Sequence, residues 1–330
     1  MNKAKWIRFF KVSPGGNTTI LLDQSQVEPE AGAQLAARLM ENMNLGGEQV
    51  GFIDWPGKKR KPAAESLPSL RMMGGEFCAN AVRAYAGILA YHEVDSLPWR
   101  GKIKSSGISA PINAYVAGEK QIDAAIEVPL GEEYAIAPLD ETQGTASLEQ
   151  GAVVSLPGIT HVILPGIPDG EGSDLELDKD LMLSARNRRR ALGLENQAAV
   201  GCIWFDLKKD MVSMLPLVWV RDTNTCCLET SCGSGALALA LFLGKTGGKA
   251  GTRCANDPRP RGVNSPPYAS YTNFYWIMQP SGEALWVSYT LQKNDKAGSG
   301  TTLFQPSNIW LGGPFRIIAR GETLQCSELA

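Results

Sequence analysis

The chain has 330 residues, which is long for one hydrophobic core and suits two domains of ordinary size. Hydrophobic residues make up 44% and charged residues 20%, the balance of a globular protein, and the net charge of −2 gives no reason to expect a nucleic-acid or membrane-surface partner. No apolar run approaches the roughly 20 residues of a membrane-spanning helix and the N-terminus lacks a signal-peptide pattern, so we expect a cytoplasmic protein.

In chain order, the first half alternates between strand and helix patterns. We expect a strand, a tight turn and a strand over 5–22, then a helix over 28–43, a strand over 49–53, a helix ending near 91, and strands at 102–104, 112–116 and 123–128. Asn17 lies at the end of the first turn, a position where Asn is favoured by the backbone alone. That explanation stays open beside a binding role.

The second half repeats this order of elements. We expect strands at 153–156 and 161–164, a helix over 177–192, strands at 200–205 and 215–220, a helix ending near 244, a hairpin of 274–278 and 284–289, and a last strand at 315–322. The segment 131–133 is the first candidate domain boundary. Residues 244–268 form a long loop whose composition indicates no role.

The chain has seven cysteines and two histidines, and these numbers limit the redox and metal chemistry that can be expected of it. An odd number of scattered cysteines in a long chain does not predict a disulfide framework and favours a reducing compartment. No CxxC or HExxH motif is present, so we expect no metal; only the doublet Cys226-Cys227 comes near to one.

Two similar cysteine motifs, one in each half, organise the chain. Segment 74–81 (GGEFCANA) carries Cys78 and segment 229–236 (ETSCGSGA) carries Cys232, and each is followed by a helical pattern. The partial positive charge at a helix N-terminus favours thiolate over thiol and binds anions. Small residues after each cysteine allow close approach to the backbone. The pattern therefore predicts two thiols beside a site for a carboxylate-sized anion.

Such a pair suits proton transfer at the α-carbon of an amino acid. The negative charge that develops there must be stabilised by preorganised donors, which two helix N-termini supply. Inversion needs a thiolate on one face to take the proton and a thiol on the other to return one, and the two thiols would titrate as a coupled pair. The alternative interpretation is two structural cysteines buried where helices begin in tight packing.

Together with Asn17 after two glycines, these motifs resemble the three signature stretches of the diaminopimelate epimerase-like racemases. The resemblance implies an α+β fold of two similar, mostly β domains, each wrapped round a central helix, with the active site between them and no PLP or other cofactor. Gly312-Gly313-Pro314 is similar to the family's C-terminal end. This implies an N-terminal domain of 1–131, completed by the strand at about 314–330, and a C-terminal domain of 132–313.

Within this family the strongest likeness is to the histidine racemase branch, which supplies D-histidine for opine-type metallophores; segments 16–21, 48–52 and 73–78 carry it. The likeness implies that Cys78 and Cys232 are the acid/base pair and that a small-molecule amino acid is the substrate. The α-carboxylate would be held by Asn17, Asn80 and the backbone of Ala79, Gly233 and Ser234. Glu48 would meet the substrate's amino group or side chain. We expect no cofactor and no metal, and a homodimer as the oligomer.

Three departures from the epimerase pattern bear on the substrate. The epimerase has CGNG where this chain has 78–81 (CANA), GNPH where it has 158–161 (GITH), and ERG where it has 220–222 (VRD). Two of the replaced residues hold the distal end of diaminopimelate, so the departures favour another substrate. Three alternatives stay open: diaminopimelate epimerase or a racemase of another diamino or basic amino acid, a non-catalytic thiol- or anion-binding protein of this fold, and a PLP enzyme.

Overall fold

The computed structural model describes residues 5–57, 67–130, 134–139, 146–168, 174–208, 211–222, 224–247, 273–294 and 303–325. Contacts within the chain divide it into two compact units, Met1–Val128 with Gly312–Ala330, and Pro129–Leu311. From residue 248 onward, the loop expected over 244–268 lies outside the described residues. Among the described residues, no helix has both the length and the apolar composition needed to cross a membrane.

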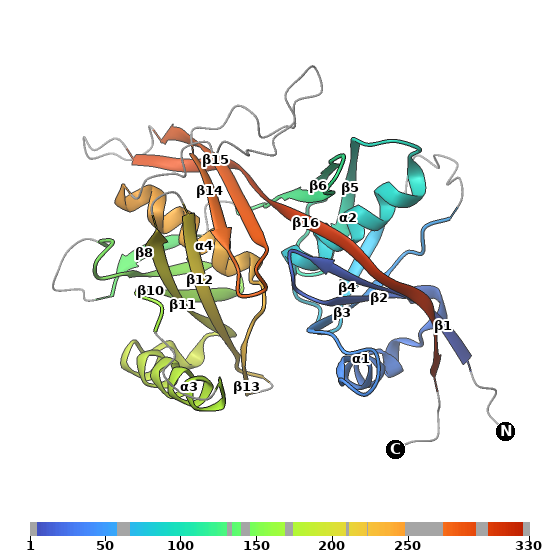
Figure 1. Cartoon of the computed structure of the whole chain (residues 1–330), viewed down its shortest axis with the longest axis horizontal. Helices are drawn as coiled ribbons and strands as arrows, with labels where there is room; N and C mark the ends of the chain where they lie inside the picture. The colour runs from blue at the N-terminus through green and yellow to red at the C-terminus, as the bar shows by residue number, and fades with distance from the viewer. Residues whose placement is uncertain are drawn as a thin grey trace. The chain divides into compact units, whose positions relative to one another are not determined.

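The first unit is a sheet that closes on itself. Its strands are β1 (Lys5–Pro14), β2 (Thr19–Asp23), β3 (Gln49–Ile53), β4 (Ser69–Met72), β5 (Trp99–Ser105), β6 (Ile112–Ala117), β7 (Asp123–Glu127) and the C-terminal part of β16 (Leu303–Gln325). Each of β1 to β7 is hydrogen-bonded to the next, and β16 is hydrogen-bonded to both β7 and β1. Figure 1 shows β1 and the end of β16 side by side, in antiparallel register from Lys5↔Gln325 to Pro14↔Phe315. The strands therefore form a ring.

Helix α2 (Ala79–Glu93) is buried in this unit. Every residue from Asn80 to Ala90 is buried, and the helix contacts β1, β5, β6 and β7. A helix buried on all faces must be surrounded by other elements of the chain. Gly87 allows one close approach, because a Cβ there would lie 2.6 Å from ring atoms of Phe315 in β16. Arg83 also points inward and donates to carbonyl oxygens of β7 and β16.

The predicted helix over 28–43 is shorter in the structure. After a 3-10 turn at η1 (Gln24–Gln26), Pro29 opens a second one, η2 (Pro29–Ala31), and helix α1 (Gly32–Met40) follows. Leu35 and Leu39 of α1 share a hydrophobic cluster with Phe52 of β3. The apolar spacing therefore identified the helix, whereas the Pro turn set its start.

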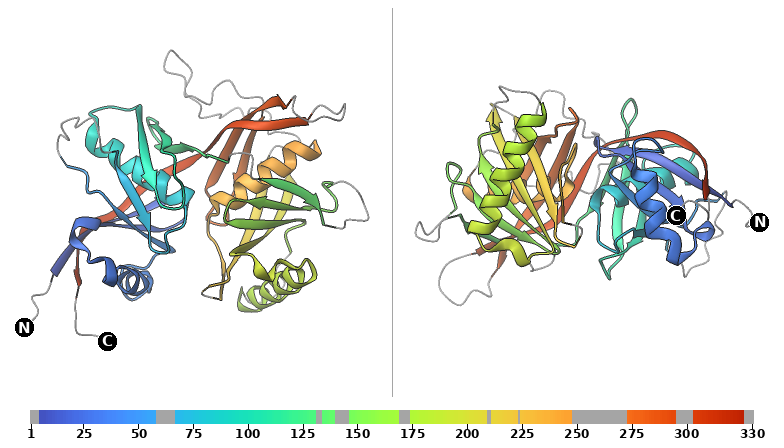
Figure 2. Two further views of the ribbon diagram at one scale, coloured as in Figure 1. Left: turned by 180° about the vertical axis from the view of Figure 1, so that it is seen from behind. Right: turned by 90° about the horizontal axis from the view of Figure 1, so that it is seen from below.

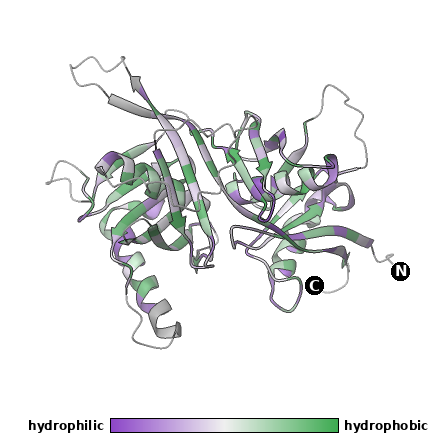
Figure 3. Ribbon diagram, turned by 45° about the horizontal axis from the view of Figure 1, so that its top comes forward, coloured by the Kyte–Doolittle hydropathy of each residue, from purple (hydrophilic) through white to green (hydrophobic). Residues whose placement is uncertain are grey.

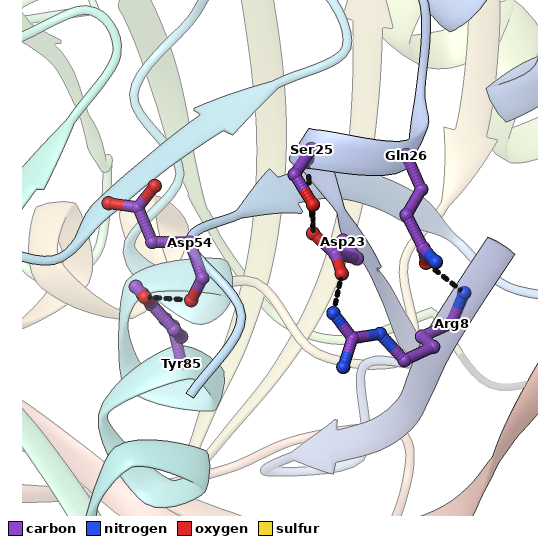
Figure 4. Close-up of polar contacts among 6 residues, drawn as sticks. All are labelled: Arg8, Asp23, Ser25, Gln26, Asp54 and Tyr85. Atoms are coloured by element: carbon purple, nitrogen blue, oxygen red, sulfur yellow. Dashed lines mark hydrogen bonds and ion pairs between the residues drawn. The ribbon is translucent and has the colours of Figure 1, made fainter. Parts of the chain in front are cut away.

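The buried carboxylate of Asp23 organises the end of β2 (Figure 4). It forms an ion pair with Nη2 of Arg8, and its other oxygen accepts from the backbone N and the Oγ of Ser25 at 3.0 and 2.7 Å. Nearby, the hydroxyl of Tyr85 in α2 donates to the carbonyl oxygen of Asp54 at 2.6 Å. The Asp23 bonds connect the start of β1 to the end of β2, and the Tyr85 bond connects the central helix to the residue that follows β3.

The second unit is a mixed sheet with one helix on each face. Its elements are β8 (Ala135–Pro138), β9 (Ala152–Leu156), β10 (Ile159–Pro165), α3 (Asp174–Ala191), η4 (Leu194–Asn196), β11 (Ala199–Lys208), β12 (Met211–Val220), β13 (Thr225–Leu228), α4 (Gly233–Thr246), β14 (Asn273–Met278) and β15 (Ala284–Asn294). The strand order is β16-β15-β14-β12-β11-β10-β9-β8, with β13 added beside β12. The pairs β10–β11 and β12–β14 are parallel.

The two helices lie on opposite faces of the sheet. Alternate residues of a strand point to opposite sides, and α3 and α4 contact residues of β11 that point to different sides. Leu181 of α3 shares a cluster with Cys202 of β11, whereas Phe242 of α4 packs edge-on against Phe205 of the same strand at 5.8 Å between ring centroids. Figure 2 shows this arrangement from two further sides. Hydrophilic and hydrophobic residues alternate along α3 (Figure 3), while the α4 residues Gly235–Leu243 are all buried.

Candidate active site

Cys78 is the N-cap of helix α2. Its backbone is extended, with φ −128° and ψ 109°, and its Sγ accepts from the backbone N of Ala81 at 3.5 Å. An extended cap residue whose side chain accepts from the N–H three positions on is the usual way to begin a helix, although Ser, Thr, Asp and Asn are the common caps. A cysteine in this role holds a half-buried sulfur at the positive end of the helix.

The thiol of Cys78 also donates to Oε1 of Gln49 at 2.8 Å. Gln49 is the first residue of β3 and lies opposite Thr19 in the parallel pairing of β2 and β3. Its Nε2 donates to Oγ1 of Thr19 at 2.7 Å and to Oδ1 of Asn17 at 2.5 Å. Gln49 therefore connects the thiol to the turn that precedes β2.

The carboxylate of Glu48 completes this cluster. One oxygen accepts from Nδ2 of Asn17 at 3.1 Å and the other from the backbone N of Thr18 at 3.1 Å. Asn17 is only 5% exposed, which leaves its side chain in contact with these partners and not in solvent. Asn17, Glu48 and Cys78, which the sequence identified as site residues, thus lie in one hydrogen-bonded group. Gln49, which joins them, was not identified.

The first residues of α2 differ in burial. Ala79 is half-buried, and Asn80 is 5% exposed. Oδ1 of Asn80 accepts from Nη1 of Arg83 at 3.2 Å, so this side chain is oriented by the arginine inside the ring of strands. The backbone N–H groups of a helix's first turn point out of its end, where an anion can bind them.

Cys232 begins helix α4 with the same geometry. Its φ and ψ are −119° and 106°, and its Sγ accepts from the backbone N of Gly235 at 3.4 Å. The sulfur lies 3.5 Å from Oγ of Ser234. Gly235 has no room for a side chain, because a Cβ there would lie 2.8 Å from Ile203 and 3.2 Å from the cysteine sulfur. Gly233 is buried and Ser234 half-buried in the same first turn.

A second glutamine anchors Cys232. Oε1 of Gln279 accepts from the backbone N of Cys232 at 3.0 Å, and Nε2 of Gln279 donates to the carbonyl oxygen of Ile277 in β14 at 3.1 Å. Gln279 lies 47 positions further along the chain, and its own surroundings in the sequence carry no motif that marks it. Only the fold identifies it as a neighbour of the candidate site.

The environment of Cys232 opposes the expected effect of the helix N-terminus. Burial raises the pKa of this thiol well above its ordinary value, and the negative charge and hydrogen bond of Glu229 raise it further. Hydrogen bonds from Ser234 and Gly235 act in the opposite direction but are weaker. Desolvation of a charge in a site only 3% exposed therefore acts against the thiolate that a helix N-terminus is expected to favour.

Other reactive side chains lie elsewhere in the second unit. His161 of β10 has no exposed surface, and neither ring nitrogen has a hydrogen-bond partner in the described part of the chain. Cys226 is half-buried and Cys227 exposed in β13. The residues with described positions include no cluster of three or more His, Cys, Asp or Glu side chains that could hold a metal ion.

The sequence of the chain matches a known family. The family model described as "Histidine racemase CntK N-terminal domain" matches residues 6–258. A histidine racemase of Fusobacterium nucleatum is 28% identical over 324 residues, which cover 97% of each chain. A histidine racemase of Staphylococcus aureus is 25% identical over 244 residues, 72% of this chain and 79% of that one.

Solved structures of low sequence identity share the fold. A hydroxyproline epimerase from Agrobacterium vitis has a TM-score of 0.60 at 11% identity, covering 98% of this chain and 94% of that one. A protein from Pseudomonas aeruginosa described as a predicted epimerase has a TM-score of 0.56 at 14% identity, covering 97% of this chain and 100% of that one. A phenazine biosynthesis protein of the PhzF family from Enterococcus faecalis has a TM-score of 0.51 at 13% identity, covering 96% and 99%. The fold is thus of the proline-epimerase and PhzF kind, with mixed barrels of strands.

Proposed function

Because this chain belongs to the histidine racemase family, we propose that it interconverts L- and D-histidine by inverting the α-carbon. It is an isomerase, an amino-acid racemase. The observation that carries the choice of histidine is the family match over residues 6–258, together with relatives named as histidine racemases. In the same proposal the enzyme works without a cofactor, in the cytoplasm and as a homodimer, and supplies D-histidine for a metallophore.

The proposed chemistry uses two sulfurs. A thiolate takes the α-proton and becomes a thiol, and the other thiol gives its proton to the opposite face and becomes the thiolate for the reverse reaction. Cys78 and Cys232 suit these roles, because each is the N-cap of a helix and accepts from the N–H three residues on. The raised pKa of Cys232 supports its starting as the proton donor.

The proposed binding site for the amino acid uses residues around both helix starts. We assign the α-carboxylate to Asn17, Asn80 and the backbone N–H groups of Ala79, Gly233 and Ser234, and the amino group or imidazole to Glu48. The hydrogen-bonded group of Asn17, Glu48 and Cys78 supports the first half of this assignment. The finer form of the fold, in which each unit is built round α2 or α4 as in diaminopimelate epimerase, belongs to the same proposal and is supported by the burial of both helices.

The test is α-proton exchange in D₂O. Reduced protein is incubated with a panel of L-amino acids, and loss of the α-proton is followed by NMR and the D-isomer by chiral chromatography. We expect exchange with L-histidine, and a loss of at least roughly 100-fold in Cys78→Ser and in Cys232→Ser, because each removes one acid/base group. Cys227→Ser is the control: this cysteine is exposed, lies outside both motifs and should leave the rate unchanged.

The other candidate functions give different results in the same assay. Exchange with diaminopimelate or another basic amino acid, and not with histidine, would keep the two-cysteine mechanism and change the substrate. Wild-type rates in both Cys→Ser variants would rule out the mechanism. The absence of exchange with every amino acid, in protein that carries free thiols, would support the non-catalytic alternative.

A further inference from the structure

We propose that Gln49 is a positioning residue: it holds the Cys78 thiol as a hydrogen-bond donor, in an orientation that the Glu48 carboxylate imposes through the side-chain amide of Asn17. We call the chain Glu48–Asn17–Gln49–Cys78 the polar relay. The role of Cys78 as a proton-transfer group comes from the proposed function, whereas the relay itself is read from contacts within the first unit.

The direction of the relay begins at Glu48. An ionised carboxylate only accepts hydrogen bonds, and the backbone N–H of Thr18, which can only donate, holds one of its oxygens at 3.1 Å. The amide of Asn17 must therefore turn its NH₂ group to the other oxygen, which lies 3.1 Å away. Its Oδ1 then faces the opposite way, toward Thr19 and Gln49.

The second amide must follow the first. Oδ1 of Asn17 accepts from Nε2 of Gln49 at 2.5 Å and from the hydroxyl of Thr19 at 3.2 Å. If the amide of Gln49 were reversed, two carbonyl-type oxygens would face each other at this distance with no proton between them, which is unfavourable in this part-buried place. Nε2 therefore stays on Asn17, and Oε1 is presented to the sulfur of Cys78 at 2.8 Å.

An oxygen acceptor against the sulfur stabilises the thiol and not the thiolate. Glu48 is exposed and Gln49 and Cys78 are half-buried, but Thr19 is fully buried and Asn17 is 5% exposed, so water cannot readily replace the bonds in the middle of the relay. The parallel pairing of Thr19 with Gln49 also fixes the two strands against each other. Glu48 therefore controls the protonation of Cys78 through two intervening amides, besides any direct effect of its charge.

Two other charged side chains lie close to Cys78 in the chain. Glu76 precedes it by two residues and is exposed, and Arg83 lies in the second turn of α2, where it donates to Asn80. In the hydrogen bonds described for this region, the relay passes through neither of them. Glu76 is therefore a control for Glu48, since removal of either carboxylate takes away one negative charge and only Glu48 belongs to the relay.

The experiment measures how fast iodoacetamide labels Cys78, by peptide mass spectrometry across pH 6 to 10, in protein without substrate. The variants are Glu48→Gln, Gln49→Leu, the double variant, and Glu76→Gln in the wild-type and Gln49→Leu backgrounds. A Gln at position 48 can donate as well as accept, which frees both amides to turn and lets Gln49 donate to a thiolate. We expect Glu48→Gln to label Cys78 about tenfold faster at neutral pH, with the pH midpoint of labelling about one unit lower.

The double variant decides whether the effect travels through the relay. We expect Glu48→Gln to change the labelling rate less than twofold when Gln49 is already Leu, and Glu76→Gln to have the same effect in both backgrounds. An effect of Glu48→Gln that is undiminished in the Gln49→Leu background would overturn the relay in favour of direct electrostatics, and so would no effect of Glu48→Gln in the wild type. Circular dichroism checks folding, and Gln49→Met carries the same comparison if Gln49→Leu does not fold.

The result is independent of the proposed function. Labelling needs no substrate. Coupling between Glu48 and Cys78 in a protein that exchanges no amino acid would therefore support the relay and contradict the proposed racemase activity. Exchange of histidine without that coupling would support the proposed racemase activity and contradict the relay.

Discussion

At the scale of single residues, Cys78 and Cys232 show how one local motif acquires two different environments. Both cap a helix, but Cys78 is half-buried and donates to a glutamine, whereas Cys232 is buried beside Glu229. Desolvation and a neighbouring negative charge both disfavour a thiolate, and both raise the pKa of Cys232. Both cysteines are the N-cap of a helix, so the difference in their surroundings comes from their neighbours.

His161 makes a prediction at the same scale. Burial lowers its pKa from 6.5 to about 3, so between these values the unfolded chain binds a proton that the folded chain does not. The unfolded state is therefore favoured as the pH falls through this window, and we expect a loss of about 1.4 kcal/mol in unfolding free energy per pH unit from this residue. Urea unfolding between pH 4 and 7 measures the slope, and His161→Leu should make it shallower by this amount.

His92 is the control for this prediction. Its pKa is also lowered, by burial and by Arg320, but its side chain is only half-buried. His92→Gln should therefore change the slope less than His161→Leu. Equal slopes for the wild type and His161→Leu would contradict the assignment.

At the scale of elements, short polar networks set where strands begin and end. The Asp23 carboxylate, only 1% exposed, forms the ion pair with Arg8 and caps the turn at Ser25 (Figure 4). The sequence offered no periodic signal for this network, because Arg8 and Asp23 are 15 positions apart. The folded structure holds this buried carboxylate in place through its partners Arg8 and Ser25.

Asp23→Ala should destabilise the first unit. The change leaves Arg8 without its ion-pair partner and Ser25 without its acceptor, and since Arg8 is 39% exposed we expect a loss of about 2 kcal/mol, below the roughly 3–5 kcal/mol of a fully buried pair. Urea denaturation gives the value. Glu28→Ala is the control, because it breaks an ion pair with Lys5 on the surface. The side chain of Glu28 is 69% exposed and that of Lys5 is 42% exposed, so the loss of unfolding free energy should be less than about 0.5 kcal/mol. Equal losses in the two variants would show that burial is not the deciding factor.

At the scale of the whole molecule, the C-terminal end of the chain completes the N-terminal unit. Strand β16 pairs with β1 from Lys5↔Gln325 onward, and it is also bonded to β7. The first unit is therefore finished only when the last described strand is in place. Its folding requires contacts between the two ends of the chain.

A truncation tests this closure. Deletion of residues 315–330 removes every residue of β16 that pairs with β1, and it removes Phe315 from its place against Gly87 of α2. We expect amide hydrogens of β1 to exchange at least roughly 100-fold faster, measured by hydrogen-exchange mass spectrometry. A control that ends at Gln325 keeps every β1–β16 pair and should retain protection. Unchanged protection of β1 in the longer deletion would refute the structural role of β16.

Local periodicity was sufficient to predict most elements. The expected strands at 49–53, 112–116 and 274–278 correspond to β3, β6 and β14, and the two helices that follow the cysteine motifs are α2 and α4. Three short strands, β4, β8 and β13, were not predicted, because four residues carry too little pattern and their pairing is decided by distant partners. Strand β16 is also far longer than the predicted 315–322, since its added length is fixed by pairing.

The sequence by itself determined which residue types begin the two helices and which family the motifs resemble, because cap residues, glycines and apolar spacing act over a few positions. Only the tertiary structure decided the partners of the thiols. Gln49 lies 29 positions from Cys78 and Gln279 lies 47 from Cys232, and the buried state of Cys232 depends on strands from across its unit. Burial and hydrogen-bond direction are properties of the packed chain, and they decide on which atom a proton rests.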